Sequence, residues 1–467
     1  MKKLPFYIIA LPCLVLALDG CQKEEKTPDG DSSSEKPVIS VRKPSAYSFL
    51  PGTYSLPYTI DNPREGVQLE VSTDDEWITG LTADEKAISF SLTAGSPSEE
   101  RSGSIQVSYE GAEPVSVEIR QKKEDVVPLD KDGITANCYI VPEAGVYQFT
   151  MVKGNSTDPV GKVAAVEVLW ETFGTDKAPE QGALIPAVIY IDNTVYFKTD
   201  NNFRKGNAVI AARDAGGIIL WSWHIWMTDK PQDQLYLNGA GTMMDRHLGA
   251  TSATPGDAGA LGLLYQWGRK DPFLGSSSGK EAVPAKSTAE WPVPVKSDAT
   301  SGTIENSIAH PMTFITANSY NYDWCYTGDE SVDITRWKSV KTVYDPCPPG
   351  YRVPDGGLAG IWAKAWKSEV FVETAGEDSD YGYNFGSSGS FGNKLSEAEE
   401  CWYPVTCALS TEGKLNYSLS NCKCWSCTTE EYSASALLIT RVDEKIYIKP
   451  AILHDQGSGY SVRCMKE

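Results

Sequence analysis

Ile88-Ser-Phe-Ser-Leu92 alternates apolar and polar side chains, and four other stretches of the N-terminal third repeat this pattern. They are Leu56-Pro-Tyr-Thr-Ile60, Val67-Gln-Leu-Glu-Val71, Ile105-Gln-Val-Ser-Tyr109 and Val115-Ser-Val-Glu-Ile119. Successive side chains of an extended strand point to opposite faces, so each stretch predicts a strand with one buried face. Residues 37–124 are therefore predicted to form a β-sandwich, the first sandwich.

The rest of the 467-residue chain continues in short runs rich in Val, Ile, Thr, Tyr and Trp, broken by Gly, Pro and Asn. This composition predicts a mainly β fold, and the length supports about three domains. Residues 125–230 are predicted to form a second sandwich and residues 231–467 a third domain. In the third domain, apolar residues at helical spacing after Gly-Gly predict a helix over 358–366, and the family resemblance described below implies another over 261–267.

The stretch Ile218-Ile-Leu-Trp-Ser-Trp-His-Ile-Trp226 closes the second sandwich. Alternation places Trp221, Trp223 and Ile225 on one face of this strand, and Ser222, His224 and Trp226 on the other. The chain has four histidines and none of the others lies near His224 in sequence. We therefore expect His224 to be a hydrogen-bonded structural residue and not a metal ligand or catalytic base.

The N-terminus has the features of an export signal. Lys2 and Lys3 precede an apolar run, Leu4 to Leu18, that is too short to span a membrane. Leu18-Asp19-Gly20-Cys21 resembles the lipobox of bacterial lipoproteins, which implies a signal peptide over residues 1–20 and a lipid on Cys21. The Pro-, Gly-, Ser- and acid-rich residues 21–36 predict a tether. Lys23-Glu24-Glu25 resembles the lipoprotein export signal of Bacteroidetes-type bacteria, which implies surface exposure on the outer membrane, although a generic charged linker is the alternative.

Three family resemblances accompany these segments. Thr59-Ile-Asp-Asn-Pro63, Trp77-Ile78, Arg101-x-Gly103-x-Ile105 and Gln121 resemble the BACON domain, an immunoglobulin-like module of Bacteroidetes surface proteins linked to glycan or mucin. Thr135-Ala-Asn-Cys-Tyr-Ile-Val141 together with residues 218–226 resembles fimbrillin-like lipoprotein sandwiches.

The third resemblance rests on Met243-Met-Asp-Arg-His-Leu-Gly-Ala250, Gly262-Leu-Leu-Tyr-Gln-Trp-Gly-Arg-Lys-Asp-Pro-Phe273, Asp345-Pro-Cys-Pro-Pro-Gly-Tyr-Arg-Val-Pro354 and Gly459-Tyr-Ser-Val-Arg-Cys464. These motifs resemble the FISUMP family. That family is more distantly similar to the C-type-lectin-like and formylglycine-generating-enzyme fold, which implies an α+β third domain.

The cysteines allow two interpretations. Of 11 in the chain, Cys13 leaves with the signal, Cys21 takes the lipid, Cys138 belongs to the second sandwich and eight lie in the third domain. An even set in an exported domain favours disulfides, and the family motifs suggest a pair between Cys347 and Cys464. The alternative is a zinc site in which Cys422, Cys424 and Cys427 act with His454. The preferred interpretation includes no metal and no other cofactor.

Charge and residue spacing narrow the function. A net charge of -20 repels nucleic acid, so no nucleic-acid partner is expected. Neighbouring carboxylates such as Glu399 and Glu400 point to opposite faces of a strand, so no catalytic pair is predicted. We expect a non-catalytic lipoprotein that binds a glycan, mucin or host protein for adhesion or glycan capture. The aromatic residues expected to stack on sugar rings are Trp324, Tyr326, Trp402, Tyr403 and Trp425. An enzyme acting on glycan or cysteine substrates and a fimbria-associated subunit are the alternatives.

Overall fold

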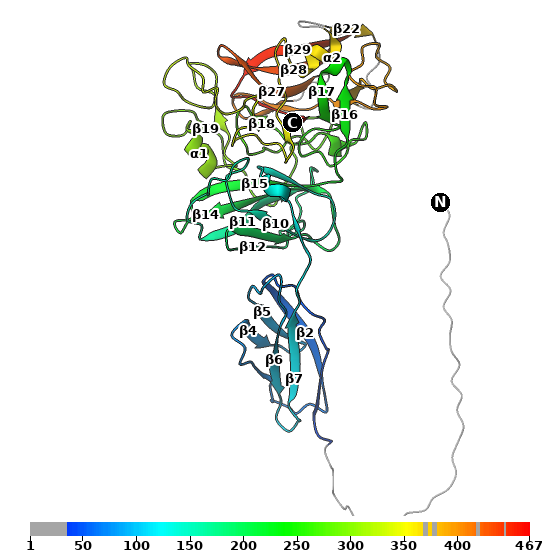
Figure 1. Ribbon diagram of the computed structural model, residues 1–467. Coiled ribbons are helices and arrows are strands. Elements are labelled where there is room, and N and C mark those ends of the chain that lie inside the picture. Colours follow the sequence, from blue (N-terminus) through cyan, green and yellow to red (C-terminus); the bar gives the residue numbers. More distant parts are fainter. Residues whose placement is uncertain (1–34, 368–371, 376–380, 417–420, 443–444) are drawn as a thin grey trace, which may run out of the picture.

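Strands dominate the computed structural model, which describes residues 35–367, 372–375, 381–416, 421–442 and 445–467 (Figure 1). The predicted mainly β fold is confirmed. The signal peptide, Cys21 and the tether through residue 34 lie outside the described residues. No described helix has the length and apolar character needed to cross a membrane.

The first sandwich consists of two antiparallel sheets. One contains, in spatial order, β1 (Val38–Val41), β2 (Gly52–Asp61), β5 (Ala87–Leu92) and β4 (Ile78–Ala83), and the other β3 (Glu70–Ser72), β6 (Arg101–Ser108) and β7 (Val115–Gln121). Alternate residues of these strands, including Ile88, Phe90, Ile105 and Ile119, fill the core between the sheets. Trp77 packs against this core and the Arg101 guanidinium lies 4.4 Å from its ring centroid, so neither face of the indole is free for a sugar.

The second sandwich also has two sheets. The outer sheet contains β12 (Ala187–Ile191), β13 (Thr194–Lys198), β10 (Val146–Thr150) and β8 (Val126–Pro128). The inner sheet contains β11 (Ala165–Thr172), β14 (Gly206–Arg213), β15 (Ile219–Met227) and β9 (Cys138–Val141). A 3-10 turn, η1 (Lys131–Gly133), connects β8 to the rest of the sandwich. Phe49 and Leu50 of the first sandwich pack against Val146 and so join the two sandwiches.

The inner sheet is buried on both faces. Trp221, Trp223 and Ile225 lie in the core between the two sheets, whereas Trp226 belongs to a second core shared with the third domain. The predicted alternation along this strand is therefore confirmed. Polar residues on the same face as Trp226 bond to their surroundings: the Ser222 hydroxyl lies 2.6 Å from the Asp271 carboxylate of the third domain.

The third domain is assembled from several small sheets and one larger one. The larger sheet contains β22 (Val372–Ala375), β29 (Lys445–Asp455), β28 (Ser433–Val442) and β27 (Cys422–Glu430). Two further sheets have the orders β16 (Asp233–Tyr236), β17 (Gly241–Met244), β31 (Met465–Lys466), β21 (Tyr351–Arg352), and β18 (Tyr265–Gln266), β30 (Gly459–Tyr460), β25 (Ala408–Leu409), β26 (Leu415–Asn416). The remaining pairs are β19 (Val295–Lys296) with β20 (Ile315–Thr316), and β23 (Gly382–Asn384) with β24 (Trp402–Pro404). Two α-helices, α1 (Ile304–Ala309) and α2 (Ile361–Trp366), and the 3-10 turns η2 (Leu237–Gly239) and η3 (Ala258–Ala260) complete the domain.

One of the two predicted helices is wrong. Residues 261–267 follow η3 and then enter β18, where Tyr265 pairs with Tyr460. Gly262 and Gly268 have φ of +71° and +82°, a left-handed conformation that an α-helix does not contain. The other helix forms three residues later than expected, as α2, because Gly360 is its N-cap.

The structure contains the disulfide suggested by the family motifs, Cys347–Cys464, whose Cα atoms are 6.0 Å apart. The wider prediction that disulfides join all eight cysteines of the third domain is wrong, because the other six are buried thiols. Three of them, Cys401, Cys422 and Cys424, share one core without a disulfide between them, whereas Cys427 belongs to another core.

The disulfide generates a prediction about stability. It closes a segment of 117 residues, and cross-linking such a segment restricts the unfolded chain by about 2–5 kcal/mol. We expect the double variant Cys347→Ala, Cys464→Ala to lower the free energy of unfolding by that amount in urea denaturation. Reductant should destabilise the wild type and leave the double variant unchanged; equal stability of the two proteins without reductant would contradict the prediction.

His224 generates a prediction about pH. The ring is buried, its Nε2 lies 2.9 Å from the Asn207 amide oxygen, and burial lowers the pKa of His224 to about 3. The prediction of a structural histidine is confirmed. In the unfolded chain the ring binds a proton near pH 6.5, but in the folded chain it stays neutral until about pH 3. The stability contributed by the neutral ring is therefore fully present above pH 6.5 and is lost progressively as the pH falls toward 3.

We expect the wild type to lose up to about 1.4 kcal/mol per pH unit more than His224→Gln between pH 6 and pH 4. The glutamine keeps a hydrogen-bonding side chain and does not titrate, so it is the matched reference. Parallel stability curves for the two proteins in urea titrations at each pH would refute this assignment.

Candidate functional site

Most of the aromatic residues predicted to form a sugar platform are buried. Trp324, Trp402, Tyr403 and Trp425 are between 0% and 4% exposed, so the predicted platform is wrong for these four. They serve packing: the Trp425 ring stacks on Tyr460 at 4.4 Å, and its indole NH donates to the Tyr265 carbonyl. Burial follows from strand position and loop packing, which aromatic content in the sequence does not reveal.

Tyr326 is the one predicted platform residue that stays partly exposed. Its ring meets that of Tyr320 edge to face, with centroids 5.9 Å apart, and Tyr322 of the same loop is 58% exposed. This small cluster of tyrosines lies on the surface of the third domain and does not line the groove described below.

The alternative zinc site is not assembled as predicted. Cys422 and Cys424 point to one face of β27 and lie in one core, whereas Cys427 lies in the other core with its sulfur 3.5 Å from an Asp355 carboxylate oxygen. His454 bonds Tyr460 through Nδ1 at 3.3 Å. Strand alternation and the irregular pairing after Trp425 turn Cys427 away from Cys422 and Cys424. The C-x-C-x-x-C spacing alone did not predict this separation.

A different histidine meets the two remaining cysteines. The Nε2 atom of His247 lies 3.2 Å from Sγ of Cys424, which is 4.0 Å from Sγ of Cys422. These three ligand atoms all lie within 4.8 Å of one another, and all three side chains are fully buried. We call them the thiol–imidazole cluster. The sequence contained a weak signal for it, because His247 is one of four histidines and lies within a family motif.

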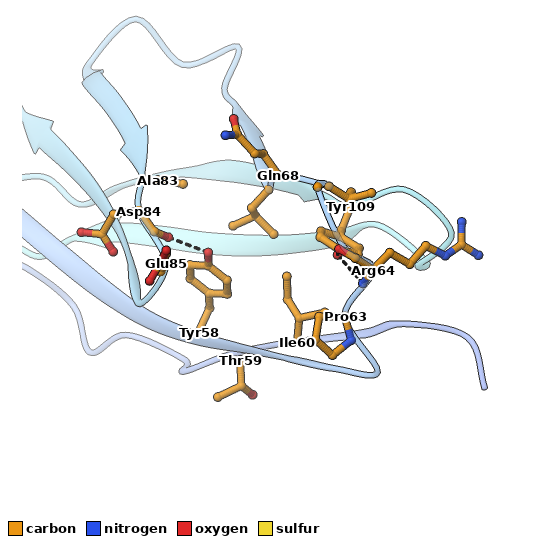
Figure 2. A pocket seen from close by; sticks show the side chains of 13 residues that line it. Tyr58, Thr59, Ile60, Pro63, Arg64, Gln68, Ala83, Asp84, Glu85 and Tyr109 are labelled. Atoms are coloured by element: carbon orange, nitrogen blue, oxygen red, sulfur yellow. Dashed lines mark hydrogen bonds between the residues drawn. The ribbon is translucent and has the colours of Figure 1, made fainter. Parts of the chain in front are cut away.

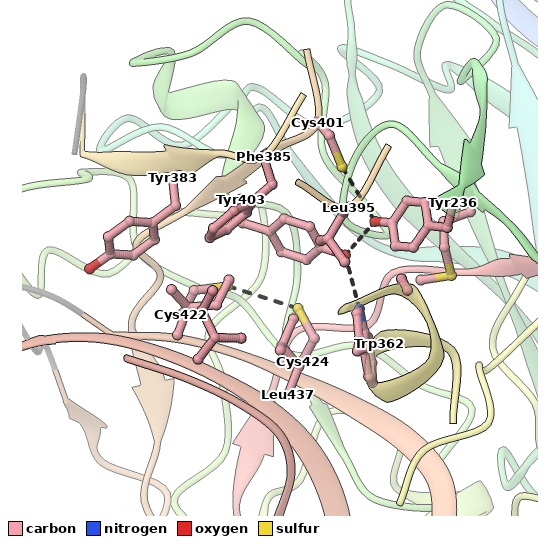
Figure 3. Packing of buried hydrophobic residues seen from close by; sticks show 14 of the residues in the cluster. Tyr236, Trp362, Tyr383, Phe385, Leu395, Cys401, Tyr403, Cys422, Cys424 and Leu437 are labelled. Atoms are coloured by element: carbon pink, nitrogen blue, oxygen red, sulfur yellow. Dashed lines mark hydrogen bonds between the residues drawn. The ribbon is translucent and has the colours of Figure 1, made fainter. Parts of the chain in front are cut away.

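Figure 3 shows aromatic residues of the buried core beside Cys422 and Cys424, and the Arg463 guanidinium is a further neighbour of this core. The Tyr403 hydroxyl is 2.5 Å from that of Tyr236 and accepts a hydrogen bond from the Trp362 indole, while the Arg463 guanidinium lies 3.7 Å from the Tyr403 ring centroid. Burial raises the pKa of the Cys424 thiol, but its contacts with Cys422 and His247 and the charge of Arg463 outweigh burial and hold that pKa well below its usual value. A fully enclosed cluster of this kind has no room for an organic substrate, but its atoms are suited to an ion.

The third domain also carries an open, largely apolar groove of about 610 Å³. Its floor is formed by Phe273, Phe314 and Leu409, and the partly exposed indole of Trp291 stands beside them. We call it the Trp291 groove. The indole is fixed by packing on Trp170 of β11, with ring centroids 5.6 Å apart, and by a hydrogen bond to the Ser287 hydroxyl.

The rim of the Trp291 groove is polar and rich in proline. Lys286 and Glu290 are exposed there, and Pro284, Pro292 and Pro294 stiffen the segment that forms the wall. A rigid aromatic surface flanked by charged groups suits a ligand with one apolar face and polar edges. Sequence reasoning missed this groove because Trp291 stands in a loop and shows no strand or helix periodicity.

A second hollow, of about 520 Å³, opens in the first sandwich (Figure 2). Two tyrosines line it, but their hydroxyls are already used: that of Tyr58 donates to the Asp84 carbonyl, and that of Tyr109 bonds both backbone groups of Arg64. Its aromatic groups therefore hold loops in place, and the Trp291 groove is the better candidate for a ligand site.

Comparison with known proteins gives no closer assignment. No protein-family model matches the chain, and no curated protein matches it. Among solved structures, a Bacteroides ovatus GH5 xyloglucanase in complex with a XXXG heptasaccharide is 16% identical over 23% of this chain and 27% of that chain, with a TM-score of 0.15. An endo-fucoidan hydrolase of glycoside hydrolase family 107 is 14% identical over 43% and 30%, with a TM-score of 0.18.

Tandem immunoglobulin domains of titin are 9% identical over 42% of this chain and 98% of that chain, with a TM-score of 0.15. This chain thus spans less than a third of the two glycoside hydrolases. At TM-scores this low, neither fold nor function is inferred from these similarities.

Proposed function

We propose that this protein is a non-catalytic, lipid-anchored cell-surface protein that binds a glycan in the Trp291 groove of its third domain. The observation that carries the proposal is the partly exposed indole of Trp291 beside an apolar floor and a charged rim. The apolar face of a sugar ring stacks on an indole while its hydroxyls bond polar neighbours, here Lys286, Ser287 and Glu290.

The lining of the groove favours binding over hydrolysis. Glycoside hydrolysis ordinarily uses two carboxyl groups on either side of the bond that breaks. Among the described residues that line the groove, Glu290 is the one carboxylate, and it lies exposed at the rim. The groove therefore supports capture of a glycan and provides no acid–base pair for its cleavage.

The order of the domains is consistent with a role outside the cell. The described chain begins in the first sandwich, and the third domain lies at the opposite end of the molecule, beyond the second sandwich (Figure 1). A lipid on Cys21 would hold the tether and the first sandwich near the membrane and project the Trp291 groove outward. We propose the outer face of the outer membrane as its location, which rests on the lipobox resemblance and on Lys23-Glu24-Glu25.

Substitution of the indole tests glycan binding. A stacked aromatic side chain contributes about 1.5–3 kcal/mol of apolar burial, so Trp291→Ala should weaken binding about 10- to 100-fold. The measurement is a glycan array with the purified full chain, followed by calorimetric titration of the strongest ligand. Trp291→Phe should retain most of the affinity, because a smaller aromatic ring still offers a stacking face.

Tyr432→Ala is the matched control, since Tyr432 is 48% exposed in the third domain and does not line the groove. Its affinity should equal that of the wild type. Absence of any glycan ligand, or equal affinity of Trp291→Ala and the wild type for that ligand, would count against the proposal.

The anchor is tested separately. Cys21→Ser removes the thiol that takes the lipid, so we expect the variant to lose palmitate labelling and membrane association in cell fractionation. Cys13→Ser is the matched control, because Cys13 lies inside the predicted signal peptide and should leave with it. Labelling of Cys21→Ser at the wild-type level would show that the lipid is elsewhere or absent.

A further inference from the structure

We propose that the thiol–imidazole cluster is a buried binding site for one thiophilic metal ion of filled d shell, held by Sγ of Cys422, Sγ of Cys424 and Nε2 of His247. This site is separate from the Trp291 groove and does not depend on glycan binding. Thiolate and imidazole are the ligands that Zn(II) and Cu(I) prefer in proteins.

The spacing of the three atoms matches a metal centre. Two of their separations are 3.2 Å and 4.0 Å, and the third is at most 4.8 Å. The centre of a triangle with these sides lies about 2.4 Å or less from each corner, close to the bond lengths of about 2.0–2.3 Å from zinc to nitrogen and sulfur. The ligand atoms would need little movement to bind an ion.

The surroundings leave the cluster without a better partner. The other ring nitrogen of His247, Nδ1, has no hydrogen-bond partner, so its one polar contact is with sulfur. Two polar thiols and an imidazole enclosed in an apolar core are costly unless their polar atoms are bonded. An ion would satisfy all three atoms and would link β27 to the loop after β17, two segments distant in sequence.

Charge and ligand number favour a monovalent ion. With both cysteines as thiolates the site carries two negative charges, and Arg463 is a fully buried cation with two unbonded guanidinium nitrogens and no described carboxylate partner. A monovalent ion brings the total charge of the two thiolates, Arg463 and the metal to zero. A divalent ion leaves one uncompensated buried positive charge. The described residues place three protein ligands at this site, one fewer than structural zinc sites use, so Cu(I) fits better than Zn(II).

The test is metal binding by the full chain. The purified chain is unfolded, reduced and refolded with one equivalent of Zn(II) or of Cu(I) without oxygen, and the bound metal is measured after dialysis. We expect about one ion per chain, and X-ray absorption of the loaded wild type should show two sulfurs and one nitrogen around the metal. That measurement needs no variant and identifies the ligand atoms around each ion directly.

Variants identify the ligands. Loss of a residue that only orients a metal ligand weakens metal affinity about 10- to 100-fold, and loss of a ligand itself should cost more. We therefore expect Cys422→Ser, Cys424→Ser and His247→Gln each to weaken metal affinity at least about 100-fold. The affinity is measured in competition with a chromophoric chelator. Cys427→Ser is the matched control on the same strand, and its affinity should stay within about twofold of the wild type.

Three results would overturn the proposal. The first is a substoichiometric metal content after refolding with either ion, with the fold confirmed by circular dichroism. The second is equal affinity of the Cys424→Ser variant and the wild type. The third is a disulfide between Cys422 and Cys424 in the chain as purified from cells, detected by mass spectrometry without reduction.

Discussion

The inner sheet of the second sandwich, β11, β14, β15 and β9, is buried on both faces, and the rest of the structure depends on this. One face supplies the core of the sandwich, and the other packs against the third domain through Trp170, Val209 and Trp226. Polar groups are paired across the boundary: Lys270 and Asp271 meet Ser222 on the second face, and the amide of Asn137, the residue before β9, donates to the Asp345 carbonyl. Because unpaired buried polar groups are costly, these bonds fix the relative position of the two units more strictly than apolar contact alone.

Both candidate sites are built on this sheet. The indole of Trp291 rests on Trp170 of β11, so the wall of the groove is supported from the neighbouring domain. The loop that carries His247 is tied to the sheet twice: the Asn207 amide donates to the Gly249 carbonyl, and the Trp226 indole donates to the Ala250 carbonyl. The second sandwich is therefore more than a spacer between the membrane and the third domain, since it positions the side chains on which ligand and metal binding would depend.

The third domain uses its aromatic residues in two different ways. Many of its tryptophans and tyrosines are buried in two cores, where their polar atoms bond backbone carbonyls or one another, as the indole of Trp324 does with the Trp267 carbonyl. Outside the sheet of β27, β28 and β29, such residues stabilise a domain whose described helices are short. The aromatic surface left for a ligand comes from a proline-rich loop, where Trp291 is held on one side and open on the other. The thiol–imidazole cluster and the Trp291 groove thus lie within the same domain without sharing a residue.

The sequence by itself determined the mainly β fold and the two faces of β15, because alternation is a local property of an extended chain. It also marked Cys347 and Cys464 through family motifs. Only the tertiary structure decided which aromatic residues are exposed, since Trp402 and Trp291 look alike in sequence and differ in what packs over them. The same holds for the cysteines: strand alternation carries Cys427 away from Cys424, and His247 arrives from a loop 175 residues earlier in the chain than Cys422. Contacts between residues so far apart depend on how sheets pack on one another, which no local pattern encodes.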